Sequence, residues 1–278
     1  MNKTIHNKLR DFSDNNAAFK KLYLEYRHIQ FTFQGIGVNT KRKKRQKGAK
    51  TVYDKLLDYK GIHNGERCFI IATGPSLTMD DLESLKGEYT IAMNSICKLY
   101  DKTDWRPTYY AVQDNYVFDN MQGILRKHKE VPVFLADNIW NRFKREPEWI
   151  EFPFDSMYHA YDMKIGKLHA KFSGDAYDIV YDGYSIAYSC LELAVYMGFK
   201  EIYLLGCDCT YLGAKEHFVD SGVEDRNRKN LTPMLFVGYE EAKRYADSHD
   251  IKIYNATRGG VLEVFPRVNF DDIEKKEF

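Results

Sequence analysis

From residue 66 onward, short uninterrupted runs of hydrophobic residues alternate with longer stretches that have the apolar spacing of helices. Runs of about four to eight apolar residues rich in Ile, Val, Phe and Tyr are typical of strands buried on both faces. We therefore predict strands over 68–72, 89–94, 108–114, 131–137, 201–208 and 251–255.

Helical spacing between these strands completes an alternating pattern. We predict helices over 77–85, 184–197 and 239–248, with Gly198 as the C-terminal cap of the second, and leave residues 138–183 irregular. Alternating strands and helices favour an α/β fold, here a Rossmann-like, mostly parallel sheet with helices on both faces. Ligands in such sheets bind beyond the carboxyl ends of the strands, so the residues at those ends are the informative ones.

The first 60 residues have a different pattern. Residues 17–26 have helical spacing, a basic run fills 41–50, and 51–59 fit a second short helix. We divide the chain into a helical and basic N-terminal segment, 1–61, and a catalytic domain, 62–278. The basic run is interpreted as a solvated, mobile segment; the alternative is peripheral contact with anionic lipid headgroups through residues 41–50.

Composition narrows the class of protein. Forty-one Lys and Arg balance 40 Asp and Glu, which argues against a nucleic-acid partner. No apolar run approaches the length of a membrane span or a signal peptide, and the five cysteines form no Cys-x-x-Cys pair, so we expect a reducing, cytoplasmic location. The 21 tyrosines suit the binding of sugars or nucleotides.

The turn after the first strand, which includes Thr73, Gly74, Pro75 and Ser76, is the sharpest chemical signal and is predicted to contact a nucleotide phosphate. Gly74 allows a ligand to approach the backbone, Pro75 presets a helix start, and Ser76 can cap the helix or contact a phosphate. The following helix, 77–85, would then direct its positive end at an anion. The alternative is a tight turn without a ligand. The turn fits neither a Walker loop nor the Gly-x-Gly-x-x-Gly fingerprint.

Polar residues end the other strands. Asn94, Gln113 and Asp114 are candidates for nucleotide contacts, and Asp208 leaves its strand shortly before Tyr211 and His217. A carboxylate, a phenol and an imidazole together suit acid–base chemistry. The chain contains no Asp-x-Asp, which favours a mechanism without a metal ion, and we expect no cofactor.

Three segments resemble a bacterial superfamily: the strand and turn 69–77, Asn94 at the end of the next strand, and 198–208. The superfamily includes the sialyltransferases of glycosyltransferase family 42, the Maf-type flagellin glycosyltransferases and the archaeal 6-hydroxymethylpterin pyrophosphokinases. The resemblance covers scattered blocks from about residue 66 to 257.

In the sialyltransferases the corresponding residues hold the cytidine monophosphate of the donor. The resemblance therefore implies donor contacts from Gly74, Pro75, Ser76, Asn94, Asp114 and Gly206, with Tyr211 near the leaving group. The chain departs from those enzymes at Thr73, where they usually have Asn, and at 183–185, which replaces their Thr-Ser-Gly loop. Their catalytic His lies farther downstream. Arg258, in a tail like that of polysaccharide-locus relatives, could pair with a phosphate.

Three functions remain open. The first is a metal-independent glycosyltransferase, sialyltransferase-like, that moves a sugar from a nucleotide donor to a glycan or lipid-linked acceptor, with His217 or Asp208 as base. The second is an ATP- and magnesium-dependent pterin diphosphotransferase with Asp114 and Asp208 on the metal. The third is a non-catalytic relative that binds a nucleotide or glycan. The sequence leaves open whether the chain forms a homo-oligomer.

Overall fold

The computed structural model describes residues 16–139, 145–210, 218–219, 222 and 228–274. The chain divides into a smaller unit, residues 1–49 with 155–169, and a larger unit, residues 50–154 with 170–278. Residues 50–61, grouped above with the N-terminal segment, fall in the larger unit. Leu56, in the 3₁₀ helix η1 (Asp54–Tyr59), is fully buried in the core of that unit.

The smaller unit contains the long helix α2 (Ala17–Gln46) and the short helix α5 (Ala160–Lys164). Asn16 caps α2 by accepting a hydrogen bond from the Phe19 N–H at 3.1 Å. Residues 41–46 of the basic run form the last turns of α2, and Lys41, Lys43 and Lys44 are exposed, in agreement with the predicted solvation of this run. Lys and Arg are good helix formers, and positive charge at a helix C-terminus is favoured by the helix dipole.

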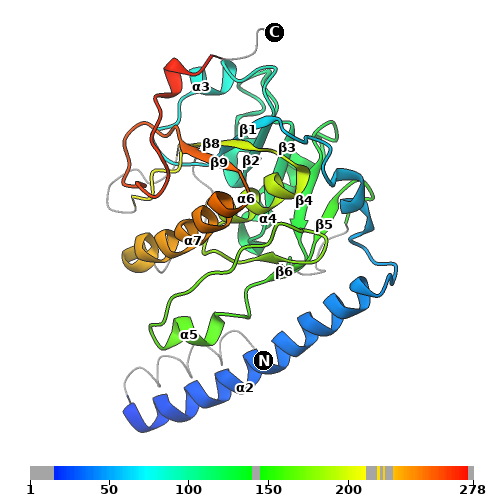
Figure 1. Cartoon of the computed structure of the whole chain (residues 1–278), viewed down its shortest axis with the longest axis vertical. Helices are drawn as coiled ribbons and strands as arrows, with labels where there is room; N and C mark the ends of the chain where they lie inside the picture. The colour runs from blue at the N-terminus through cyan, green and yellow to red at the C-terminus, as the bar shows by residue number, and fades with distance from the viewer. Residues whose placement is uncertain (1–15, 140–144, 211–217, 220–221, 223–227, 275–278) are drawn as a thin grey trace. The chain divides into compact units, whose positions relative to one another are not determined.

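The larger unit is built on a seven-stranded sheet in which every pairing is parallel, as Figure 1 shows. The strand order is β5-β4-β3-β2-β1-β8-β9. The bounds are β1 Arg67–Ile71, β2 Thr90–Met93, β3 Tyr109–Val112, β4 Val133–Ala136, β5 Ile150–Phe152, β8 Glu201–Leu205 and β9 Lys252–Asn255. The predicted parallel sheet is confirmed; β5 was not predicted. Two further short strands lie outside this sheet, β6 (Phe154–Asp155) and β7 (Val180–Tyr181).

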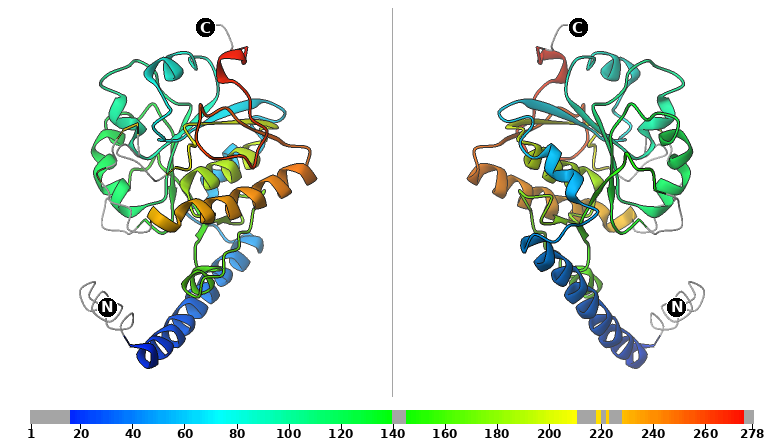
Figure 2. Two further views of the ribbon diagram at one scale, coloured as in Figure 1. Left: turned by 90° about the vertical axis from the view of Figure 1, so that its left-hand side faces the viewer. Right: turned by 90° about the vertical axis from the view of Figure 1, so that its right-hand side faces the viewer.

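Helices cover both faces of the sheet, as predicted. Alternate residues of β1 point to opposite cores: Cys68 and Ile70 belong to one, Phe69 and Ile71 to the other. Helices α6 (Ile186–Met197) and α7 (Arg228–Ser248) lie together on the first face, as both views in Figure 2 show. The second face carries α3 (Met79–Glu83), η2 (Asn94–Leu99), α4 (Asn115–Leu125) and η3 (Phe270–Asp272).

The chain order creates a switch point between β1 and β8. Successive strands step outward from β1 to β5, and the chain then returns to place β8 and β9 on the other side of β1. Ile71, the last residue of β1, pairs with Leu205, the last residue of β8. The connections that follow β1 and β8 therefore run to opposite sides of the sheet. This arrangement opens a crevice at the carboxyl ends of the two strands. Among the helices described, none is long and apolar enough to cross a bilayer.

Candidate functional site: a pocket at the switch point

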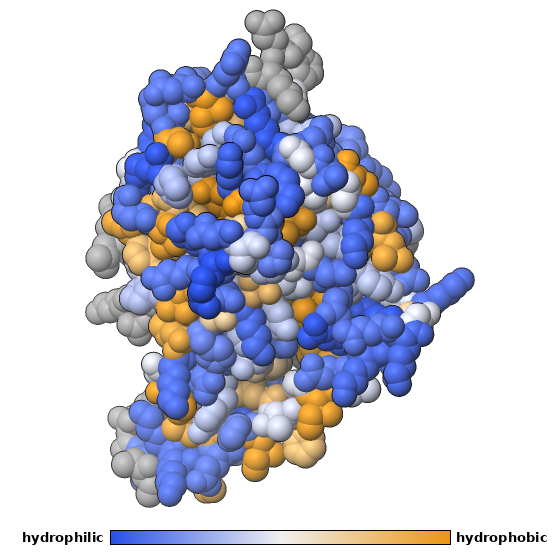
Figure 3. Space-filling model, viewed as in Figure 1, coloured by the Kyte–Doolittle hydropathy of each residue, from blue (hydrophilic) through white to orange (hydrophobic). Residues whose placement is uncertain are grey.

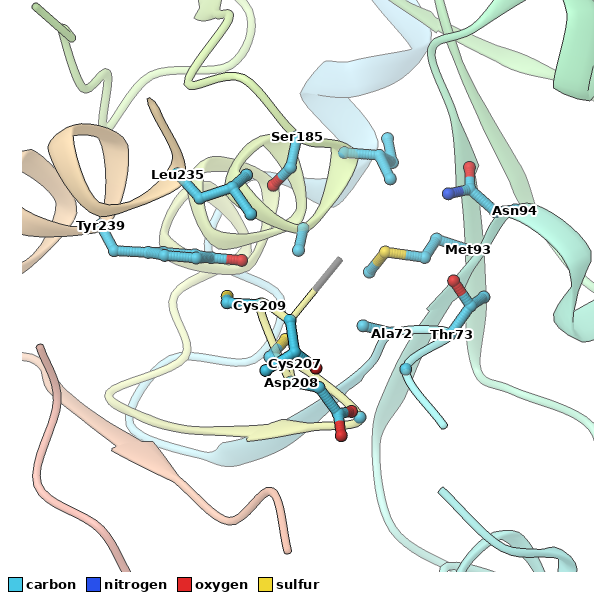
Figure 4. A pocket seen from close by; sticks show the side chains of 15 residues that line it. Ala72, Thr73, Met93, Asn94, Ser185, Cys207, Asp208, Cys209, Leu235 and Tyr239 are labelled. Atoms are coloured by element: carbon cyan, nitrogen blue, oxygen red, sulfur yellow. The ribbon is translucent and has the colours of Figure 1, made fainter. Parts of the chain in front are cut away.

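An open pocket lies at the carboxyl ends of β1, β2 and β8, with about 540 Å³ of empty space that includes its mouth (Figure 4). Five predicted site residues line it: Thr73, Gly74, Asn94, Gly206 and Asp208. The remaining lining comes from neighbouring residues at the strand ends and from the N-terminal end of α6 and part of α7: Ala72, Met93, Ser185, Ile186, Ala187, Cys207, Cys209, Thr210, Leu235 and Tyr239.

Two glycines let the turns after β1 and β8 touch. The Gly74 N–H donates to the Gly206 carbonyl at 2.8 Å. A Cβ at residue 74 would lie 1.9 Å from Asp208 Oδ2 and 2.4 Å from the Gly206 carbonyl oxygen, so no larger residue fits. Gly206 itself has φ +70°, a left-handed conformation that favours glycine. Glycine at residue 74 is therefore required by the contact between the two turns, and glycine at residue 206 by its left-handed backbone.

Asp208 is the carboxylate of the pocket. Its residue surface is 7% exposed, and the Ser76 hydroxyl donates to its Oδ2 at 2.8 Å. Burial raises the pKa of Asp208 above its ordinary value of 3.8, and the hydrogen bonds from Ser76 partly offset that rise. Ser76, predicted as a helix cap or phosphate contact, is instead a partner of this carboxylate.

Asn94 ends β2 in a strained backbone conformation. Its φ is +51°, in the left-handed region that Asn tolerates better than most residues. The Tyr110 hydroxyl donates to the Asn94 carbonyl and holds this turn from the second core. Figure 4 shows the Asn94 amide at the side of the pocket. Unusual backbone conformations of this kind are found where the surrounding structure fixes one geometry, and Asn94 lines the pocket.

The helix that directs its N-terminus at the pocket is α6, not the helix predicted over 77–85. That segment holds only the five-residue helix α3. Thr78 caps it, and the Asp81 carboxylate accepts the Thr78 N–H at 2.9 Å, so a negative charge already occupies its N-terminal end. The prediction failed because the sequence Thr78-x-x-Asp81 forms its own capping box.

Helix α6 is twelve residues long and begins at the pocket. Ser185 caps it by accepting the Tyr188 N–H at 3.2 Å, and Ile186 and Ala187 of its first turn line the pocket. The N–H groups of a first turn have no partner within the helix, and the dipole adds partial positive charge there. This end of α6 can hold an anion such as a phosphate.

Four other predicted residues in the described part of the chain, Gln113, Asp114, Arg258 and Pro75, are not among the residues that line the pocket. Gln113 accepts a hydrogen bond from the Ser189 hydroxyl at 2.7 Å, and Asp114 caps α4 by accepting the Tyr116 and Val117 N–H groups. Arg258 forms ion pairs with Asp81 at 2.5 Å and with Asp271 at 2.6 Å. Both terminal nitrogens of its guanidinium therefore already contact carboxylates. Pro75 lies in the turn after β1. Tyr211 and His217 lie outside the described residues.

Sequence reasoning missed the contribution of α7. Tyr239 is 2% exposed, and Figure 4 shows its hydroxyl directed at the pocket. The hydroxyl of Thr232, which precedes Tyr239 in α7, donates a hydrogen bond to the Cys209 carbonyl at 2.8 Å. This bond connects α7 to the turn after β8. The predicted helix began only at Tyr239, because Pro233 obscured the first turns of α7. Among the described residues, no three His, Cys, Asp or Glu side chains are grouped to hold a metal ion.

Comparisons with known sequences and solved structures gave the following matches. No curated protein sequence matches the chain. The Maf glycosyltransferase from Magnetospirillum magneticum AMB-1 aligns with a TM-score of 0.47 and 14% identity over 82% of this chain, which spans 40% of that protein. The Campylobacter jejuni sialyltransferase CstII, solved with cytidine-5'-monophosphate, aligns with a TM-score of 0.42 and 16% identity over 74% of this chain and 85% of its own.

A family match covers most of the chain, including β1 to β8 and the turns that form the pocket. Residues 43–214 match the family described as 6-hydroxymethylpterin diphosphokinase MptE-like. This match confirms the predicted resemblance to the superfamily that contains such proteins. The chain belongs to the 6-hydroxymethylpterin diphosphokinase MptE-like family.

Proposed function

We propose that this chain is a glycosyltransferase that moves a sugar from a nucleotide-activated donor to a glycan or lipid-linked acceptor without a metal ion. A CMP-linked nonulosonic acid, such as sialic acid, is the first donor to test. The observation that supports this proposal is one pocket that combines the N-terminus of α6, the amide of Asn94 and the carboxyl of Asp208.

The lining of the pocket suits a donor with a single phosphate. Asp208 is its one carboxylate, and no Lys or Arg is among its described lining residues. The first-turn N–H groups of α6 would hold the phosphate oxygens, and Thr73 and Asn94 would contact the nucleoside through their polar side chains. The proposed donor contacts of Gly74 and Gly206 would be made through backbone atoms, because both glycines line the pocket and have no side chain.

Asp208 is the proposed base. The acceptor hydroxyl oxygen attacks the anomeric carbon, the bond from that carbon to the phosphate oxygen breaks, and the phosphate leaves with the electron pair. The acceptor proton passes to Asp208, whose raised pKa makes it a better proton acceptor than an exposed carboxylate. The α6 N-terminus stabilises the departing phosphate. His217 is the alternative base, and Tyr211 is proposed beside the leaving group.

A second candidate function follows from the family match. The family's description names a diphosphokinase that acts on 6-hydroxymethylpterin. Transfer of diphosphate from ATP requires magnesium held by carboxylates. Asp208 is placed to take part, whereas Asp114, the other carboxylate considered for the metal, has Oδ1 engaged by two N–H groups of α4. This difference makes the glycosyltransferase the better supported of the two.

A thermal-shift panel of CMP, CDP, UDP, GDP and ATP, each with and without magnesium, separates the candidates. A ligand at about 100 times its dissociation constant stabilises the fold by about 2.7 kcal/mol. We expect CMP to raise the melting temperature without magnesium. A shift by UDP or GDP would keep the transferase with another donor, a shift only by ATP with magnesium would favour the diphosphokinase, and no shift would leave the pocket structural.

The panel is followed by turnover. Release of CMP from CMP-sialic acid in the presence of a glycan acceptor would establish transfer, and binding without release would favour a non-catalytic relative. We further propose that the chain forms a homo-oligomer. We also propose that residues 41–50 contact the membrane surface peripherally.

A further inference from the structure

Helix α2 carries a line of exposed apolar side chains, here called the α2 apolar stripe: Leu22, Tyr26, Ile29, Phe33 and Ile36. Their exposed fractions are 62%, 42%, 58%, 69% and 55%. The spacing alternates between four and three residues, which places all five along one side of the helix. Figure 3 shows apolar patches where α2 lies, at the lower edge of the view.

The stripe is not the face on which α2 packs within the chain. Tyr23, Phe31 and Arg45 are buried, at 7%, 8% and 3% exposure, and they lie on another side of the helix. In the part of the chain that the structure describes, the stripe remains open to solvent. Five large apolar side chains in one exposed line are more than scattered surface residues require, so the line indicates an interaction surface.

Charge indicates the partner. Helix α2 contains eight Lys and Arg residues and one acidic residue, Glu25. Lys43 and Lys47 fall on the continuation of the stripe's spacing, and they are exposed together with Lys44. A second copy docked along the stripe would bring two strongly positive helices together with little acidic charge to pair with. An anionic lipid surface matches both the apolar line and the positive end.

We propose that α2 binds the surface of an anionic membrane, with the apolar stripe in the boundary between headgroups and acyl chains and Lys43, Lys44 and Lys47 on the lipid phosphates. The helix lies in the plane of the membrane. This surface is separate from the pocket at the switch point, so its role does not depend on which reaction that pocket performs.

Vesicle flotation with the full-length chain tests the proposal. We expect the chain to float with vesicles of phosphatidylglycerol and phosphatidylcholine in equal parts and to stay behind with pure phosphatidylcholine. Ile29→Ser with Phe33→Ser should lower the partition coefficient by about tenfold or more. Lys43→Gln with Lys44→Gln should lower it by about fivefold for each charge removed, and added salt should have the same effect.

Matched variants keep the result interpretable. Val52→Ser with Leu57→Ser removes two residues that are 61% and 50% exposed outside α2, and binding should not change. Circular dichroism confirms that each variant keeps its helices. Equal binding to neutral vesicles, or none to anionic ones, overturns the proposal. A dimer in sedimentation equilibrium that Ile29→Ser with Phe33→Ser dissociates would instead assign the stripe to a second copy.

Discussion

Asn94 combines a left-handed backbone with a polar side chain at the pocket, and two substitutions separate these features. Asn94→Gly and Asn94→Ala both remove the amide, so both should abolish nucleotide binding. Ala keeps a Cβ at φ +51°, whereas Gly has none, and a Cβ in that left-handed conformation costs about 1–2 kcal/mol. Isothermal titration measures binding, and urea unfolding measures stability.

We expect Asn94→Ala to be less stable than Asn94→Gly while neither binds nucleotide. Binding that survives in Asn94→Gly would remove the amide from the site. Equal stability of the two variants would show that the turn relaxes when the side chain is changed.

Asp208 should control the acid side of the activity profile. Its carboxyl can take the acceptor proton only when ionised, so activity should fall as pH drops through its pKa, which lies above 3.8. Because the Ser76 hydrogen bond lowers that pKa, Ser76→Ala should shift the acid limb to higher pH. Asp208→Asn should lose about 10²–10⁴-fold in rate at every pH.

Steady-state rates across pH, measured as CMP release, check this assignment. An acid limb that persists unchanged in Asp208→Asn would transfer the role of base to His217. If the acid limb of the pH–rate profile of Ser76→Ala stays at the wild-type pH, the Ser76 hydroxyl does not lower the pKa of Asp208.

At the scale of elements, substitution of one glycine inside α2 and of one just beyond its C-terminus should have opposite effects on stability. Gly37 lies inside the helix, and an added Cβ there would meet nothing within 4 Å. Gly37→Ala should therefore stabilise α2 by about 0.5–1 kcal/mol. Gly48, just beyond the helix, has φ +80° and donates its N–H to the Arg45 carbonyl at 2.8 Å. Gly48→Ala should destabilise that helix end.

Hydrogen exchange of the α2 amides measures both changes. Slower exchange in Gly37→Ala and faster exchange near residue 45 in Gly48→Ala are expected. Faster exchange in Gly37→Ala, or slower exchange near residue 45 in Gly48→Ala, would show that these glycines do not set the stability of α2.

Strands were easier to predict than the helix ends that form the site. Buried parallel strands appear in sequence as continuous apolar runs, which identified β1, β2, β3, β4, β8 and β9. The short β5, Ile150–Phe152, has a charged centre and gives no such run. The choice between α3 and α6 depended on which N-terminus faces the crevice, and that is a property of packing that spacing along the chain does not contain.

Some polar residues that were predicted to bind a ligand have partners within the protein. The sequence could not show this, because those partners are far away along the chain. The guanidinium of Arg258 could bind a phosphate, but it forms an ion pair with Asp81, which is far away in sequence. Asp81 is 2% exposed. Gln113 likewise meets Ser189 of α6. A single sequence shows which groups could bind a ligand and does not show which of them the fold has already paired.

At the scale of the whole molecule, the fold class followed from the sequence, because the alternation of strands and helices predicted the parallel sheet. Of the residues that the strand-end rule selected, Thr73, Gly74, Asn94, Gly206 and Asp208 line one pocket, whereas Gln113 and Asp114 do not. The extent of the smaller unit did not follow, because residues 155–169 are far from α2 in sequence yet belong to the same unit.

The adjacency of β1 and β8 also sets an order of events during synthesis. Cys68, Phe69, Ile70 and Ile71 have their partners on β8 at residues 202–205, so one edge of β1 has no partner until the ribosome has released β8. Until then the nascent chain carries an apolar strand edge of the kind that pairs with other chains. Chaperones that shield such edges should therefore stay in contact with the nascent chain until β8 has emerged, and the pocket is assembled only after most of the chain has been made.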